Sequence, residues 1–319
     1  MREALNQAIR EEMARDENVI ALGEDIGTMG SPFGVMKGLL DEFGDKRIIE
    51  TPISEEGFTG MAVGAAVRGM RPIVEFMYVD FTSVAMDPIM NQAAKMRYMT
   101  GGQVNVPMVI RAPSGAGRRT AGQHTQSFES MFMNIPGLKV VSPSTPKDAK
   151  GLLKSAIRDN DPVMFMEQLL MYNDKGEVPD EEYTIPLGKA DIKRAGKDVT
   201  ILTWSLPTHF SLAAAEILAK DGIDVEVVDL RTIVPLDWET IVESVKKTNR
   251  VVIVEYGVKR GGVGAELSAK LTEELFYELD APIVRLASAN VVTPYCPALE
   301  DHIRPNRDKV VEAIREMMK

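Results

Sequence analysis

Short apolar segments alternate with helical segments along this chain, and this pattern occurs twice. In the first half, the predicted strands are 19–22, 47–50, 72–77, 106–111, 139–142 and 163–167. In the second half, they are 199–204, 225–229, 250–255 and 282–286. Short apolar strands separated by helices are typical of a parallel sheet covered on both faces. The sequence therefore predicts an α/β protein with two doubly wound domains, each with a mainly parallel sheet flanked by helices.

The helices between these strands follow the same division. The predicted helices are 54–69, 81–99 and 146–159 in the first half, and 207–220, 238–247, 264–278 and 306–318 in the second. From residue 172 to 197 the alternation stops and the chain is polar, with several prolines and glycines. A chain of 319 residues favours two domains. We therefore predict a first domain at 1–175, a linker at 176–197 and a second domain at 198–319.

Composition narrows the classes of function. The net charge is −10 and no dense basic patch occurs, which argues against a nucleic-acid partner. No apolar run is long enough for a membrane span, and the charged start does not resemble a signal peptide. The single cysteine, Cys296, excludes an internal disulfide framework and fits a reducing, cytoplasmic location. The acidic surface can attract a basic protein or simply keep the chain in solution.

The segment 51–58 predicts a helix start with two carboxylates in its first turn. Ser54 suits the N-cap position, because its hydroxyl can accept an unpaired backbone N–H. Three glycines at positions 57, 60 and 64 share one face, which costs about 1 kcal/mol each relative to alanine. Close packing of another backbone would offset that cost, so the segment predicts a carboxylate at an inter-subunit seam. The alternative is that Glu55 and Glu56 only complement the helix dipole.

The segment 113–127 predicts a functional loop at the carboxyl end of a parallel strand, where α/β proteins bind ligands. It carries His124, a side chain suited to proton transfer near neutral pH. It also carries Arg118 and Arg119, which suit an anion such as a carboxylate. The alternative is a solvated loop in which His124 only caps neighbouring backbone groups.

The chain lacks the common phosphate-binding and metal-binding motifs. Residues 261–264 read Gly-Gly-Val-Gly, but Leu267 occupies the position of the third glycine of a dinucleotide fingerprint. Residues 115–120 lack the Gly-Lys-Ser/Thr ending of a P-loop. Only three histidines occur, and none belongs to a His/Cys cluster with metal-ligand spacing. Any catalytic or binding function of this chain must therefore depend on residues outside these motifs.

Several runs, in order, resemble the beta chain of thiamine-diphosphate-dependent 2-oxo acid dehydrogenases. In that family, the beta chain is half of the decarboxylating first component of the pyruvate and branched-chain dehydrogenase complexes. The matching runs are 22–25, 51–58, 71–76, 123–126, 136–141, 148–153 and 228–237. The resemblance covers nearly the whole chain and implies a transketolase-like fold, with a pyrimidine-binding domain and a C-terminal domain.

The resemblance implies roles for individual residues. Glu55 would hydrogen-bond the pyrimidine ring nitrogen of thiamine diphosphate, and Ile53 and Phe81 would line the same pocket. A buried carboxylate favours a shared proton, which would promote the imino form of the ring that removes the thiazolium C2 proton. His124 would assist transfer of the acyl group to a lipoyl arm. Glu24 could join a proton relay between active sites.

The resemblance also implies a structural metal site and a less important second glutamate. Backbone oxygens around Ala156, Asp159 and Asp161 can hold a potassium ion in the family. Related chains often have an uncharged residue at the position of Glu56. We therefore interpret Glu56 as a dipole or solvated charge.

One family motif is missing. The diphosphate–magnesium signature, Gly-Asp-Gly followed by a more distant Asn, does not occur in this chain, because there is no Gly-Asp-Gly at all. In two-chain members the alpha chain supplies it. The resemblance therefore implies an alpha2beta2 heterotetramer in which this chain binds the aminopyrimidine and its partner binds the diphosphate and magnesium. The acidic second domain would bind the basic subunit-binding domain of a lipoyl-bearing acyltransferase core.

Two alternative functions stay open at this point. The chain could belong to an acetoin-cleaving or other transketolase-like thiamine enzyme, or it could be a non-catalytic scaffold that docks partners. The substrate is open too, because one methylene changes selectivity by only about 1–3 kcal/mol. Pyruvate and branched-chain 2-oxo acids are therefore both candidates.

Overall fold

The computed structural model describes all 319 residues and contains two compact units. Unit 1 comprises Met1–Ser114 and Met131–Leu187, and unit 2 comprises Gly115–Ser130 and Gly188–Lys319. The segment that carries His124 therefore belongs to unit 2, although the strand before it belongs to unit 1. No helix is both long and apolar enough to cross a membrane.

Unit 1 contains a parallel sheet with strand order β5-β6-β4-β3-β1-β2. Its strands are β1 (Val19–Gly23), β2 (Ile48–Glu50), β3 (Arg71–Glu75), β4 (Val109–Ser114), β5 (Lys139–Val141) and β6 (Val163–Gln168). All residues of β1, β4 and β6 are buried, as expected for central strands of a sheet covered on both faces.

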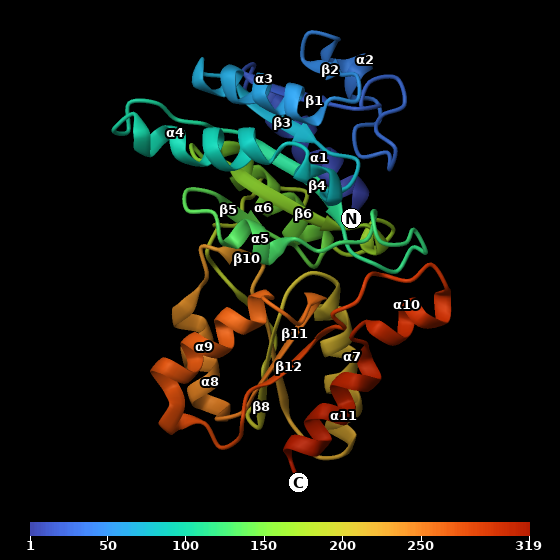
Figure 1. Cartoon of the computed structure of the whole chain (residues 1–319), viewed down its shortest axis with the longest axis vertical. Helices are drawn as coiled ribbons and strands as arrows, with labels where there is room; N and C mark the ends of the chain where they lie inside the picture. Colours follow the sequence, from blue (N-terminus) through green and yellow to red (C-terminus); the bar gives the residue numbers. More distant parts are fainter. The chain divides into compact units, whose positions relative to one another are not determined.

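Helices flank this sheet (Figure 1). They are α1 (Arg2–Arg15), α2 (Leu39–Phe43), α3 (Glu55–Val67), α4 (Ala94–Met99), α5 (Glu129–Met133), which spans the boundary with unit 2, and α6 (Pro146–Arg158). Helix α1 packs on α6, and α3 packs on β3. Shorter turns are η1 (Val79–Ser83), η2 (Asp87–Ala93) and η3 (Leu169–Met171).

Unit 2 contains a second sheet with strand order β12-β11-β8-β9-β7. Its strands are β7 (Asp191–Arg194), β8 (Val199–Thr203), β9 (Val225–Asp229), β11 (Val251–Val258) and β12 (Val284–Ser288), and β10 (Thr232–Val234) also lies in this unit. All neighbours in the sheet are parallel except the edge strand β7, which runs antiparallel to β9.

Helices cover both faces of the second sheet, with α8 and α9 on one face and α7 and α11 on the other (Figure 1). The helices are α7 (Leu206–Lys220), α8 (Trp238–Thr248), α9 (Val263–Leu275), α10 (Pro297–Ile303) and α11 (Arg307–Met317), and η4 (Phe276–Glu278) follows α9. Valine, isoleucine and leucine side chains from β8, β9, β11, α7 and α11 form the core between sheet and helices. Two mainly parallel sheets flanked by helices confirm the predicted fold class.

Proline explains two differences from the predicted elements. The helix predicted at 81–99 is divided into η1, the π-helical turn η2 and α4, and Pro88 at the start of η2 cannot donate a backbone hydrogen bond. The strand predicted at 106–111 begins later, at Val109, because Pro107 cannot join the ladder.

Within the segment predicted as a linker, residues 191–194 form strand β7.

Candidate active site

Glu55 is the first residue of α3, as the sequence predicts. The N-cap prediction for Ser54 is wrong in one respect, because the Ser54 side chain accepts no capping hydrogen bond. Its hydroxyl instead lies over Gly57, where a Cβ would come within 2.8 Å of the Ser54 Oγ. Glu55 is half-buried and Glu56 is exposed, which agrees with separate roles for the two carboxylates.

Glu24 lies just after β1, and its carboxyl is close enough to Glu55 for the two charges to interact. Burial raises the pKa of Glu24, and the charges of Glu55 and Asp25 raise it further. The Oε1 atom of Glu24 is buried without a hydrogen-bond partner, and so is Thr51 Oγ1 in the turn before α3. Buried polar atoms without partners are costly unless a ligand or water satisfies them. This part of unit 1 therefore fits a polar, hydrogen-bonding heterocycle such as an aminopyrimidine.

Phe81 belongs to a row of aromatic rings in unit 1. Its ring centroid is 6.3 Å from that of Tyr78, Tyr78 is 5.6 Å from Phe33, and Phe33 is 6.0 Å from Tyr172. Edge-to-face contacts of this kind hold rings in defined orientations. Ile53, by contrast, is 81% exposed, so any pocket that it lines needs a wall from outside this unit.

A buried ion cluster, which the sequence analysis missed, joins three neighbouring strands of unit 1. Arg111 on β4 donates two hydrogen bonds of 2.6 Å to Glu167 on β6 and one of 2.5 Å to Glu75 on β3. The Tyr172 hydroxyl donates to Glu167 at 2.5 Å, so the cluster meets the aromatic row at Tyr172. A detectable signal exists in the sequence, because Glu75, Arg111 and Glu167 are ionisable residues within predominantly apolar strands.

Burial and mutual charge determine the electrostatics of this cluster. Burial raises the pKa of Glu75, although Arg111 opposes that effect. Burial acts to lower the pKa of Arg111, but the charges of Glu167 and Glu75 outweigh it and raise that pKa. Burial also raises the pKa of Tyr172, and Glu167 adds to the effect. Arg111 is therefore a permanent cation that joins three neighbouring strands of the sheet.

The loop that carries His124 is compact. The backbone N–H of Gly115 donates to the carbonyl of Gln126 (2.9 Å) and joins the two ends of the loop. Inside it, Thr120 Oγ1 donates to the His124 carbonyl (3.2 Å) and Thr125 Oγ1 to the Ala121 carbonyl (2.6 Å). His124 itself is half-buried. The loop is therefore an ordered element and not a solvated tether.

The interpretation of both loop arginines as anion ligands does not hold for Arg119. Its guanidinium forms ion pairs with Glu300 (2.6 Å) and Asp301 (2.8 Å), and these carboxylates raise the pKa of Arg119. Arg118 is exposed. Glu24, Ile53, Glu55 and Phe81 belong to unit 1, whereas His124 belongs to unit 2, so the role of His124 stays a prediction.

The residues predicted to hold potassium lie together at the end of α6, but other cations already neutralise them. The Lys139 ammonium is 2.6 Å from the Asp159 carboxylate and 3.4 Å from that of Asp161. Arg97 pairs with Asp161 at 2.5 Å, and Arg71 donates to the Asp159 carbonyl at 2.9 Å. The Ala156 carbonyl accepts the Asp159 N–H. These ion pairs involve side chains, and a carbonyl that accepts one hydrogen bond keeps a second lone pair, so the predicted potassium site at backbone oxygens stays a prediction.

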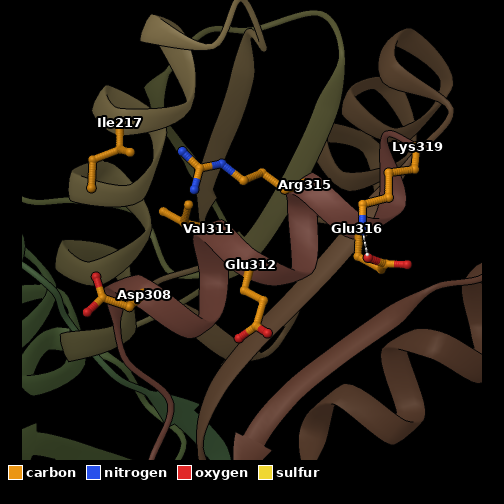
Figure 2. Close-up of a pocket in the computed structure, with 7 residues that line it drawn as sticks. All are labelled: Ile217, Asp308, Val311, Glu312, Arg315, Glu316 and Lys319. Atoms are coloured by element: carbon orange, nitrogen blue, oxygen red, sulfur yellow. Dashed lines mark hydrogen bonds and ion pairs between the residues drawn. The ribbon is translucent and has the colours of Figure 1, made fainter.

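A surface hollow of about 490 Å³ lies between α7 and α11 in unit 2 (Figure 2). Ile217 and Val311 form its apolar part, and charged residues of α11 surround them. Arg315 pairs with Asp221, and Lys319 pairs with Glu316. None of the predicted site residues lines this hollow, so we do not assign it to the active site.

Comparison with known protein families agrees with the two-unit fold. Residues 1–174 match the transketolase pyrimidine binding domain, and residues 188–310 match the transketolase C-terminal domain. A solved structure described as a split gene transketolase, inactive beta4 tetramer, superimposes with a TM-score of 0.82 over 99% of this chain and 97% of that chain. At 23% identity, this likeness concerns the fold alone.

Sequence relatives are much closer. The 2-oxoisovalerate dehydrogenase subunit beta of Bacillus subtilis is 48% identical, with 99% of this chain and 97% of the relative covered. The pyruvate dehydrogenase E1 component subunit beta of Porphyra purpurea is 49% identical, with 100% and 96% covered. The acetoin:2,6-dichlorophenolindophenol oxidoreductase subunit beta of Cupriavidus necator is 48% identical, with 99% and 96% covered.

Proposed function

This chain belongs to the family of thiamine-diphosphate-dependent E1 beta subunits of 2-oxo acid dehydrogenases, and we propose that it is the catalytic beta subunit of such an enzyme. Its reaction would be the oxidative decarboxylation of pyruvate or a branched-chain 2-oxo acid, followed by acyl transfer to a lipoyl group. The observation that carries the proposal is the Glu24–Glu55 pair: Glu24 Oε1 is buried without a hydrogen-bond partner, and its carboxyl interacts with the charge of Glu55, the first residue of α3.

In this proposal, the four predicted site residues of unit 1 bind or orient the aminopyrimidine. Glu55 would hydrogen-bond the ring nitrogen, and Glu24, whose pKa burial and the charges of Glu55 and Asp25 raise, would lie beside it. Phe81 packs on the ring, with the aromatic row behind it, and Ile53 lines the pocket. When bound, thiamine diphosphate supplies the carbanion chemistry that removes carbon dioxide. The role of this chain is then to orient the ring and control its protonation.

An alpha subunit would complete the site in an alpha2beta2 heterotetramer. This chain has no Gly-Asp-Gly sequence for diphosphate and magnesium. Ile53 is 81% exposed, and a Cβ added at Gly60 or Gly64 of α3 would meet nothing within 4 Å. An exposed apolar and glycine-rich surface next to a predicted cofactor residue supports docking of a partner there.

Acyl transfer and attachment to the core complete the proposal. His124 would assist transfer to a lipoyl arm, since imidazole suits proton transfer near neutral pH. Unit 2 would bind the basic subunit-binding domain of the acyltransferase. Residues 188–319 contain 21 acidic and 18 basic side chains, so local acidic groups, rather than a large net charge, would form that surface.

Acetoin cleavage is a second candidate function, and one specific observation favours it. The Cupriavidus necator relative is as similar to this chain as the Bacillus subtilis relative, at 48% identity over nearly the same length. Overall similarity therefore does not select the substrate. A scaffold without catalysis is less well supported, because the Glu24–Glu55 pair and Phe81 are all present in the fold.

The test is co-expression with the alpha partner, followed by assays of thiamine-diphosphate-dependent decarboxylation with a dye acceptor. Substrates would be pyruvate, 3-methyl-2-oxobutanoate and acetoin. We expect activity only in the co-complex, and the preferred substrate identifies the enzyme. Glu55→Gln should lower kcat by about 10²–10⁴-fold while assembly is intact, as expected for a lost proton-transfer group.

Glu56→Gln is the matched control, because Glu56 is the exposed neighbour in the same helical turn. It should retain near-normal activity. A co-complex that assembles with Glu55→Gln and keeps full activity would exclude the catalytic role of Glu55. Stable assembly without activity on any of the three substrates would favour the scaffold.

A further inference from the structure

The His124 loop is held within unit 2 by side chains that the proposed chemistry does not use. Glu300, on α10, is fully buried. One of its carboxylate oxygens accepts the Gly117 N–H (2.7 Å), and the other accepts from Arg119 (2.6 Å). Asp301 adds a second ion pair to Arg119 (2.8 Å). A single carboxylate therefore binds both the backbone and a side chain of the loop.

The backbone conformation of the loop depends on such contacts with residues outside the loop. Arg119 and Ala121 have φ values of 62° and 59°, in the left-handed region that side-chain-bearing residues rarely adopt. Residues in such conformations persist when surrounding contacts over-determine them. The Arg119 guanidinium fork is the contact that fixes one of these two residues.

Further contacts hold the beginning, middle and end of the loop. The Tyr256 hydroxyl donates to the Ala116 carbonyl (3.1 Å), and Arg304 donates to that hydroxyl. A Cβ added at Gly122 would come within 2.6 Å of the Val292 Cγ1, so the loop packs closely against Val292. At the end of the loop, the Trp204 indole hydrogen-bonds the buried Glu129 carboxyl. Unit 2 therefore positions the loop along its whole length.

We propose that Glu300, through Arg119 and the Gly117 N–H, is a positioning residue that holds the His124 loop in the conformation used for acyl transfer. This inference rests on the proposed function and concerns residues of unit 2. The Glu300 and Arg119 contacts act on the loop that carries His124, so their effect on acyl transfer can be separated from decarboxylation. Loss of these contacts should impair transfer to the lipoyl group and spare decarboxylation.

The experiment uses the co-complex with Glu300→Gln and Arg119→Gln. The second variant changes a side chain that is 33% exposed, so it provides a test if the buried substitution prevents folding. Arg315→Gln is the matched control, because it breaks the Arg315–Asp221 ion pair (2.7 Å) in the same unit, far along the sequence from the loop. Two rates are compared, dye-linked decarboxylation and reductive acylation of a free lipoyl domain. Amide hydrogen exchange of residues 115–128 gives a readout that needs no activity.

We expect acylation of the lipoyl domain to fall about 10-fold or more, as for lost hydrogen bonds to charged groups, with dye-linked decarboxylation unchanged. Exchange of residues 115–128 should accelerate by a similar factor, and Arg315→Gln should change neither quantity. Unchanged exchange, or equal loss of both activities, would overturn the inference. Wild-type co-complex without decarboxylation would overturn the proposed function instead, and the exchange result would still show whether Glu300 holds the loop.

Discussion

At the scale of single residues, Glu255 carries the clearest pH dependence. It is buried in β11, where its carboxylate accepts the Gly264 N–H (3.2 Å) at the start of α9. Burial and the charge of Glu129 raise the pKa of Glu255 to about 8 from its ordinary value of 4.5. Between these two pH values, the folded state keeps a proton that the unfolded state has lost. Glu255 therefore makes the free energy of unfolding decrease as pH rises through this window.

We predict that Glu255→Gln weakens this pH dependence, because a neutral amide cannot ionise. Urea unfolding at pH 6, 7 and 8 would measure it as the slope of unfolding free energy against pH. Glu129, whose pKa burial also raises, leaves part of the slope in place. Glu312→Gln, an exposed carboxylate on α11, is the control and should keep the wild-type slope. An identical slope in Glu255→Gln would show that Glu255 ionises normally in the folded chain.

Which residues could be predicted from the sequence depended on whether they act locally. Glu55 at a helix start follows from its neighbouring residues, whereas Glu24 was implied only by the family resemblance, and the structure brings the two together. The Arg111 cluster needs the register of three strands, and Glu300 contacts a loop more than 170 residues away. The pairing of Arg119 with Glu300 and Asp301 could not be foreseen for the same reason. Long-range partners are set by topology, which a single sequence does not reveal.

At the scale of elements, Arg111 connects the neighbouring strands β3, β4 and β6. Its guanidinium and the carboxylates of Glu75 and Glu167 are nearly inaccessible to water. Arg111→Met would leave two buried carboxylates without their cation, which typically costs about 3–5 kcal/mol. We expect a loss of unfolding free energy of that size in urea titrations of the chain.

Arg97→Met is the control for this prediction. Arg97 pairs with Asp161 at 2.5 Å, but its side chain is 49% exposed, and such surface pairs contribute little. Equal losses of unfolding free energy in the two variants would mean that water solvates the carboxylates of Glu75 and Glu167. That result would contradict their burial in the structure.

Helix α3 gives a second prediction at this scale. A Cβ at Gly60 or Gly64 would meet no atom within 4 Å, so the chain itself does not need glycine there. Gly60→Leu with Gly64→Leu should therefore keep or raise the Tm of the isolated chain, since leucine has the higher helix propensity. The same change should abolish co-purification with the alpha subunit if a partner packs on this face.

Ala219→Leu, an exposed position near the end of α7, controls for the added side-chain bulk and should leave assembly intact. Co-purification of the Gly60/Gly64 variant at wild-type yield would place the partner on another surface. A large fall in the Tm of the isolated chain would instead indicate contacts within the chain.

Strand periodicity predicted most elements because short segments rich in valine, isoleucine and leucine are easily recognised, as in β1 and β8. Short polar elements such as β7 and α10 were missed, since their formation depends on pairing and packing with distant segments. The division of the helix predicted at 81–99 into η1, η2 and α4 could not be predicted, because it depends on how the folded chain accommodates Pro88. Local patterns therefore predict long apolar elements well and short polar elements poorly.

At the scale of the whole molecule, the chain contains two transketolase-family domains and no diphosphate–magnesium signature. Residues 1–174 match a pyrimidine binding domain, and in the proposed function another chain supplies the diphosphate and metal site. The exposed Ile53 and the open glycine face of α3 are consistent with a site that is finished by another chain. Cofactor binding should therefore depend on assembly.

We predict that thiamine diphosphate with magnesium does not change the Tm of the isolated chain but raises that of the co-complex. A ligand at 100 times its Kd that binds only the folded state adds about 2.7 kcal/mol to the free energy of unfolding. Differential scanning calorimetry of both samples measures the effect, and magnesium alone is the reference. Glu55→Gln in the co-complex should show a smaller rise, because the diphosphate contacts persist while the pyrimidine contact is lost. An equal rise in the isolated chain would mean that one chain holds the whole cofactor, and it would exclude a divided site.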